Sequence, residues 1–115
     1  MRDRLSPSVN LQFYSPRFLI VELFKHKERL SRATCLSEEY LLQAFHTLIG
    51  RLEFVTEANI LLGTWMEAHR LCKAVDEADT PYVALTLHLD GRLWTDDKEL
   101  KAGLRANGFD YCLEP

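Results

Sequence analysis

Residues 81–89 (PYVALTLHL) restrict the fold of this 115-residue chain more than any other segment. Asp79 or Thr80 can cap a helix that begins here, and the turn-forming pair Asp90 and Gly91 ends it. Such a helix is apolar on nearly every side, and a helix of this kind is stable only when other elements surround it. The segment therefore predicts a buried helix inside a folded domain.

Short apolar strands alternate with helices along the chain. Ser15 with Pro16 favours a helix start, Ser37 is a helix N-cap, and Gly50 is a helix stop. The predicted strands cover residues 10–14, 51–55, 92–94 and 109–112, and the predicted helices cover residues 16–30, 38–49, 57–74, 81–89 and 97–106. This alternation predicts one α/β domain over residues 1–115, with a mostly parallel sheet and helices on both faces.

Composition excludes several classes of protein. A hydrophobic content of 47% is enough for a core, and a net charge of −3 argues against a basic protein that coats nucleic acid. The cysteines are odd in number and widely spaced, which indicates packed, reduced thiols in a cytoplasmic protein; they are Cys35, Cys72 and Cys112. No HExxH-type histidine pair, signal peptide or membrane-spanning run is found, so no membrane association is expected.

Two acidic clusters flank the apolar helix and the strand that follows it. Asp76 and Asp79 precede the helix, and Asp96 and Asp97 follow the strand. In parallel α/β sheets, sites lie at the carboxyl ends of strands and the adjoining helix starts. Carboxylate oxygens there suit hard cations such as Mg²⁺. The pattern indicates metal-assisted phosphoryl chemistry rather than a thiol or Ser/His mechanism.

Each acid also has a purely structural interpretation. Asp79 can be a helix N-cap before Thr-Pro, and Asp96, Asp97 or Thr95 can cap the next helix. A third acid, Glu22, lies at the border of an apolar helix face and can pair with its neighbours Lys25 or His26. On these features alone, both the ligand and the structural interpretations stay open.

Other groups with possible functions have stronger structural interpretations. The basic residues of the first helix can contact phosphates, but a solvated helix face explains most of them; they are Arg17, Lys25, Lys27, Arg29 and Arg32. Trp65 and Trp94 are predicted to be core aromatics rather than platforms for base stacking.

Together, these residues resemble the PIN domain family, the small metal-dependent nucleases that include VapC-type toxins. The step from Tyr14-Ser15-Pro16 to Glu22 resembles the second acidic position of the family. Asp79 matches the third acid, and Asp97 in the run Thr-Asp-Asp-Lys-Glu-Leu matches the fourth. The resemblance covers residues 10–112, and its second half is the more specific.

The resemblance implies a three-layer α/β/α sandwich and a function. Glu22, Asp79 and Asp97 would hold Mg²⁺ or Mn²⁺ and act in the hydrolysis of RNA phosphodiester bonds. It also implies RNA as substrate and an antitoxin-like protein as a possible partner. One alternative is an inactive PIN-like fragment that binds a protein. Another is an unrelated α/β interaction module whose acidic turns only cap helices.

The chain departs from the family at its start. The family opens with a central strand that carries an Asp-x-Asn motif, and no such motif precedes Asn10. Asp3 lies in an irregular polar stretch and does not take this role. We therefore expect a chain shortened at its N-terminus that lacks the first strand. An open sheet edge would then favour a homo-oligomer.

Overall fold

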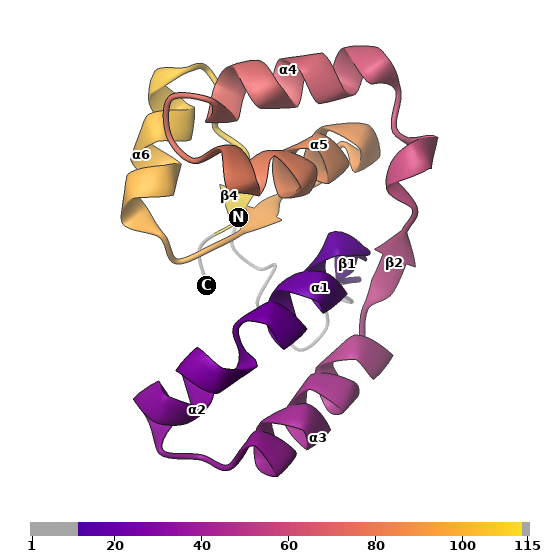
Figure 1. The fold of residues 1–115 in the computed structure, drawn as a ribbon. Coiled ribbons are helices and arrows are strands. Elements are labelled where there is room, and N and C mark those ends of the chain that lie inside the picture. The colour runs from indigo at the N-terminus through magenta and orange to yellow at the C-terminus, as the bar shows by residue number, and fades with distance from the viewer. Residues whose placement is uncertain (1–11, 114–115) are drawn as a thin grey trace, which may run out of the picture. The chain divides into compact units, whose positions relative to one another are not determined.

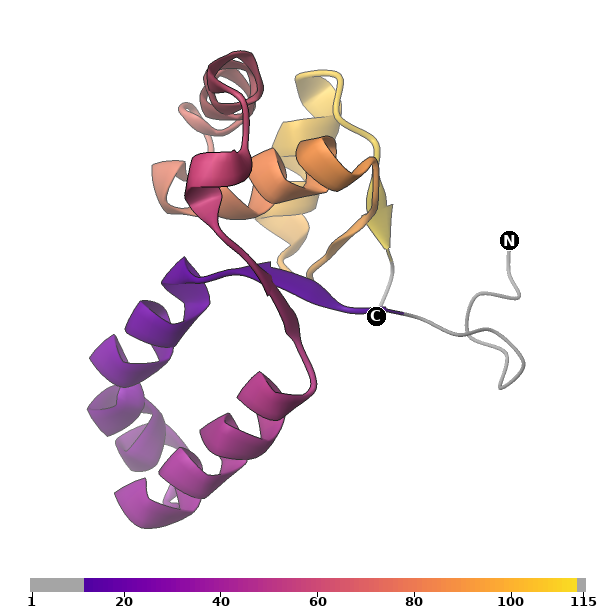
Figure 2. The ribbon, with the colours of Figure 1, turned by 90° about the vertical axis from the view of Figure 1, so that its right-hand side faces the viewer.

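A computed structural model describes residues 12–113 of the chain. These residues form two compact units that divide after Phe54, and Figures 1 and 2 show the order of their elements. The positions of the two units relative to one another are not determined. The single domain over residues 1–115 stays a prediction.

The first unit is mainly helical. Its elements are β1 (Tyr14–Pro16), α1 (Phe18–Lys25), α2 (Lys27–Thr34), α3 (Glu38–Gly50) and β2 (Glu53–Val55). Strand β1 pairs with β2, and α2 packs against α3 (Figure 1). Leu41 and Phe45 of α3 are buried, whereas α1 and α2 have no buried residue. The cap predicted at Ser37 is confirmed, because its hydroxyl accepts a hydrogen bond from the Tyr40 N–H over 3.1 Å.

The helix expected over residues 16–30 is wrong in two respects. It begins later, because Ser15 and Pro16 belong to β1 and the Ser15 hydroxyl donates to the Pro16 carbonyl instead of capping. It also divides at His26, whose φ of −105° and ψ of 6° depart from helical values. The His26 N–H still donates to the Glu22 carbonyl over 3.1 Å, so the chain bends there without losing that bond.

The second unit is built around the buried helix. Its elements are η2 (Glu57–Asn59), α4 (Leu62–Cys72), η3 (Glu77–Asp79), α5 (Thr80–Leu89), β3 (Leu93–Trp94), α6 (Lys98–Ala106) and β4 (Cys112–Leu113). Helix α5 packs against both α4 and β3, and its residues 83–86 are buried. The prediction of a buried, all-apolar helix is confirmed, and its side chains form the centre of one hydrophobic core.

Strands β3 and β4 run parallel. Leu93 is aligned with Cys112 and Trp94 with Leu113, and the Leu93 N–H donates to the Tyr111 carbonyl over 2.8 Å. Helix α6 connects the two strands, as an α/β fold requires. The α/β class is confirmed. Within residues 12–113 the strands form two separate pairs, so the three-layer sandwich stays a prediction. The expected loss of a first strand concerns residues 1–11, which lie outside the described residues.

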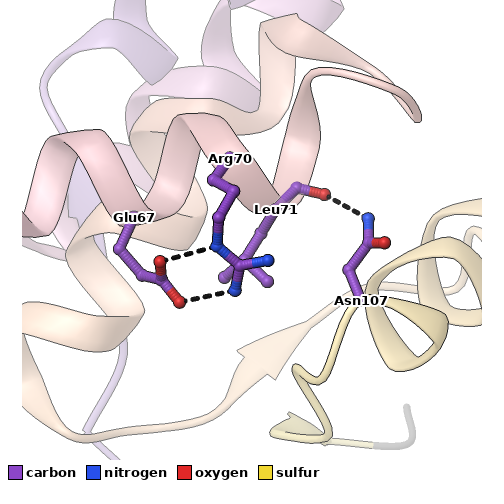
Figure 3. A network of polar contacts seen from close by, with 4 residues as sticks. All are labelled: Glu67, Arg70, Leu71 and Asn107. Atoms are coloured by element: carbon purple, nitrogen blue, oxygen red, sulfur yellow. Dashed lines mark hydrogen bonds and ion pairs between the residues drawn. The ribbon is translucent and has the colours of Figure 1, made fainter.

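The ends of α4 and α6 are joined by a side chain. Asn107 Nδ2 donates to the Leu71 carbonyl over 3.0 Å and so supplies a partner to the last turn of α4 (Figure 3). Gly108 follows with a φ of 96°, and the Phe109 N–H returns to the Leu104 carbonyl over 2.9 Å. The helix stop predicted after residue 106 is confirmed.

Arg70 makes two hydrogen bonds to the Glu67 carboxylate, of 2.7 and 2.8 Å, on the exposed side of α4 (Figure 3). Such surface pairs contribute little to stability.

None of the helices between residues 12 and 113 has both the length and the apolar character that crossing a bilayer requires.

Candidate metal centre

Asp79 directly precedes α5 but does not cap it. Its φ of −87° and ψ of −2° are helical, because η3 runs straight into α5, and its side chain makes no capping bond. Asp76 does the capping one turn earlier: its Oδ1 accepts a hydrogen bond from the Ala78 N–H over 3.0 Å. The side-chain cap predicted at Asp79 is therefore wrong. The half-buried Asp79 lies directly before the first turn of α5.

Asp97 does cap a helix. Its Oδ1 accepts a hydrogen bond from the Leu100 N–H over 3.1 Å, at the start of α6. The Asp97 N–H in turn donates to the Thr95 hydroxyl over 3.1 Å. The structural interpretation of Asp97 is confirmed. The cap uses one carboxylate oxygen, Oδ1, and the carboxylate is exposed, so capping and metal binding are compatible.

Glu22 belongs to a different unit. It is a half-buried residue of α1, within residues 12–54, whereas Asp79 and Asp97 belong to the unit of residues 55–113. Within residues 12–113, no three His, Cys, Asp or Glu side chains lie together in a group that could hold a metal ion. Because the positions of the two units relative to one another are not determined, the convergence of the three acids stays a prediction.

Comparison with known proteins decides the family. A family model described as PIN domain matches residues 2–111, nearly the whole chain and both units. The chain belongs to the PIN domain family. No curated protein and no solved structure matches it significantly. PIN domains are generally nucleases, so nuclease chemistry is the function indicated at the family level.

A buried thiol lies near the start of α5 in this PIN domain, and the sequence alone does not place it beside the acids. Cys72, the last residue of α4, is fully buried. Burial, with a smaller contribution from electrostatic repulsion by the Asp79 and Asp76 carboxylates, raises the pKa of the Cys72 thiol to about 11. The Thr80 hydroxyl lowers the pKa by more than either carboxylate raises it, and burial outweighs it.

This raised pKa predicts a difference between the cysteines of the PIN domain. At pH 8, iodoacetamide should alkylate the exposed Cys35 and spare Cys72, since the thiolate is the reactive form and Cys72 is both buried and protonated. The packed thiol predicted for Cys72 is confirmed by its burial, and the packed thiol predicted for Cys35 is wrong, because Cys35 is exposed. Mass spectrometry after timed alkylation measures the difference, and denaturant should make the two rates equal. Equal rates in the native protein would contradict the prediction.

The same pKa predicts how stability depends on pH. An unfolded Cys72 thiol ionises near its ordinary pKa of 9.0, whereas the folded thiol keeps its proton until about 11. The stabilising effect is therefore complete below pH 9 and is lost as pH rises through 11. The urea midpoint should fall across this range, and a Cys72→Ala variant should show a smaller fall.

Proposed function

We propose that this PIN domain is a metal-dependent ribonuclease that hydrolyses RNA phosphodiester bonds. Membership of the PIN domain family carries the proposal, because PIN domains are generally nucleases and typically depend on divalent metals. In the proposal, Glu22, Asp79 and Asp97 hold Mg²⁺ or Mn²⁺. These side chains offer carboxylate oxygens, the donors that hard cations prefer.

The local geometry of two acids supports this assignment. The Asp79 carboxylate is half-buried at a helix start and serves no cap there. The Asp97 cap orients its carboxylate through Oδ1, and the Thr95 hydroxyl fixes the backbone of Asp97. Groups that orient a ligand in this way strengthen metal binding. A bound ion would lower the pKa of a water molecule and stabilise negative charge on the phosphate.

The proposal extends to partners and setting. We propose a cytoplasmic enzyme with the three-layer sandwich of the family, which forms homo-oligomers or acts as a toxin held by an antitoxin-like protein. Exposed apolar side chains at the start of α4 support a protein partner: Leu61, Leu62 and Met66 are 72%, 74% and 64% exposed. Apolar side chains grouped at the surface are typical of association sites.

A second candidate function is an inactive PIN-fold module that binds a protein. One observation favours it: the Asp97 carboxylate already has a structural role, because its Oδ1 caps α6. In this candidate the acids serve only the fold, and the chain binds no divalent metal specifically.

Titration with Mn²⁺ by isothermal calorimetry separates the two candidates. We expect the parent to bind Mn²⁺ and the Asp79→Asn and Glu22→Gln variants to bind at least about tenfold more weakly, because each loses a negative ligand. Asp90→Asn is a matched control: it removes the same charge at the other end of α5, where the φ of 53° suits asparagine. Absence of specific binding to the parent, or equal weakening by Asp90→Asn, would favour the inactive module.

A further inference from the structure

The outer face of the β3–β4 pair carries two exposed aromatic rings. In a parallel pair, aligned residues share a face and successive residues alternate. Leu93 and Cys112 are aligned and pack in or against the core, so Trp94 and Leu113 point the other way. Trp94 is 56% exposed and Tyr111, two residues before Leu113, is 49% exposed. The prediction of Trp94 as a core aromatic is wrong, because the strand alternation turns it outward.

Neighbouring side chains hold the Tyr111 ring in place. The ring of Phe109, itself only 2% exposed, meets Tyr111 edge-on, with centroids 5.3 Å apart and planes at 79°. The Arg92 guanidinium lies 5.9 Å from the centroid of the Tyr111 ring, a cation–π contact. Because these contacts order the ring before any ligand arrives, Tyr111 is a preorganised stacking surface.

This aromatic face adjoins one of the proposed metal ligands. Trp94 is followed by Thr95, Asp96 and Asp97, and three extended residues span at most roughly 10 Å. A strand of a few nucleotides can therefore reach from the aromatic rings to the Asp97 carboxylate. The position links the face to the substrate of the proposed nuclease.

The size of the face distinguishes a nucleobase from a protein partner. The face covers residues 92–94 on one strand and residues 111–113 on the other, so it measures roughly 10 Å along the strands, and the strands are about 5 Å apart. These dimensions fit one or two bases. A stable protein interface needs about 800 Å² on each partner, far more than this face offers.

From these observations we propose that the bases of single-stranded RNA stack on Trp94 and Tyr111, with Arg92 beside the sugar–phosphate backbone. This inference rests on the proposed ribonuclease function and names how its substrate is bound. Exposed aromatic rings with an arginine on a sheet are well suited to unpaired bases. Residues 55–113 contain six Lys and Arg and ten Asp and Glu, a net charge of −4, so stacking rather than charge carries the binding. The affinity should accordingly depend weakly on salt.

The test measures binding of an oligouridine of about eight nucleotides in EDTA, where no metal-dependent cleavage occurs. Trp65 and Trp94 are the two tryptophans of the chain, so in a Trp65→Phe background the fluorescence reports Trp94 alone. We expect RNA to quench this fluorescence. By fluorescence anisotropy, Trp94→Ala and Tyr111→Ala should each weaken binding about 5- to 100-fold, the usual effect of removing one stacked ring. Trp94→Phe and Tyr111→Phe keep a ring and should stay within about threefold of the parent.

Two controls separate stacking from other causes. Tyr40→Ala removes an exposed aromatic ring from α3, 57% exposed in the parent, and should leave RNA binding unchanged. An abasic strand of the same length keeps the phosphates and should bind the parent as weakly as RNA binds Trp94→Ala. Circular dichroism checks that each variant is folded, and the two independent aromatic positions keep the test decisive if one of them unfolds.

The proposal is overturned if both alanine variants bind RNA like the parent, or if the abasic strand binds as tightly as intact RNA. Its failure is distinguishable from failure of the ribonuclease function. Metal-dependent cleavage that is unaffected by Trp94→Ala and Tyr111→Ala removes the stacking face and keeps the nuclease. RNA binding in EDTA that depends on both rings, in a protein without cleavage, supports the stacking face and removes the nuclease.

Discussion

The Asp97→Asn variant is expected to lose Mn²⁺-dependent RNA cleavage by on the order of a hundredfold while keeping its fold. The two effects separate because Asp97 has two tasks. As a cap, its Oδ1 accepts the Leu100 N–H, and an asparagine oxygen does this equally well. As a proposed metal ligand it supplies a negative charge, which asparagine lacks.

Cleavage of single-stranded RNA with and without Mn²⁺, together with urea unfolding, measures both effects. Asp96→Asn is the matched control, since Asp96 is an exposed neighbour that matches no family acid, and the activity of this variant should equal that of the parent. Asp97→Ala should lose the activity and also about 1 kcal/mol of stability with the cap. An Asp97→Asn protein as active as its parent, or cleavage that needs no metal, would exclude Asp97 as a ligand.

The Gly103→Ala variant is expected to lower the free energy of unfolding by about 1–3 kcal/mol. An added Cβ at this position of α6 would lie 2.6 Å from Val75 Cγ2 and 2.9 Å from Val75 Cγ1. Alanine normally stabilises a helix relative to glycine by about 0.5–1 kcal/mol. The contact outweighs this gain, because both methyl groups of the stiff, β-branched Val75 side chain lie within it.

Urea unfolding of Gly50→Ala, of Val75→Ala and of the double variant Gly103→Ala with Val75→Ala isolates the contact. At Gly50, the last residue of α3, a Cβ would meet no atom within 4 Å, so Gly50→Ala should be neutral or stabilising. The double variant Gly103→Ala with Val75→Ala should lose less stability than the sum of the single changes, because the second substitution removes the clashing methyl groups. Strict additivity, or a Gly103→Ala protein as stable as the parent, would contradict this account of the packing.

Local signals along the chain were sufficient for several elements. The α3 helix begins where Ser37 can accept a main-chain hydrogen bond and ends at Gly50, as predicted. The α5 helix follows from its uninterrupted apolar run, and α6 follows from Asp97 before it and Asn107 with Gly108 after it. Each of these signals acts between residues at most a few positions apart, and the adjacent sequence contains all the atoms involved.

Membership of the PIN domain family was also evident from the sequence. The acids at residues 22, 79 and 97 and the run after Thr95 carried that resemblance, and the family match over residues 2–111 confirms it. The structural roles of these acids could not be predicted from the sequence as well as the family could. Whether Asp79 or Asp76 caps depends on η3 joining α5 without a break, and the cap moves one turn when it does.

Only the tertiary structure decided which side chains the domain exposes and which it places side by side. Trp94 looks like a core residue in a short apolar strand, but the register of β3 against β4 turns it outward and Leu93 inward. Cys72 acquires its raised pKa from burial and from carboxylates that approach it across the turn between α4 and α5. The sequence determined the elements because helix caps, turns and periodicity are local properties. Exposure and electrostatic environment depend on contacts between residues far apart along the chain, and these exist only once the elements have packed.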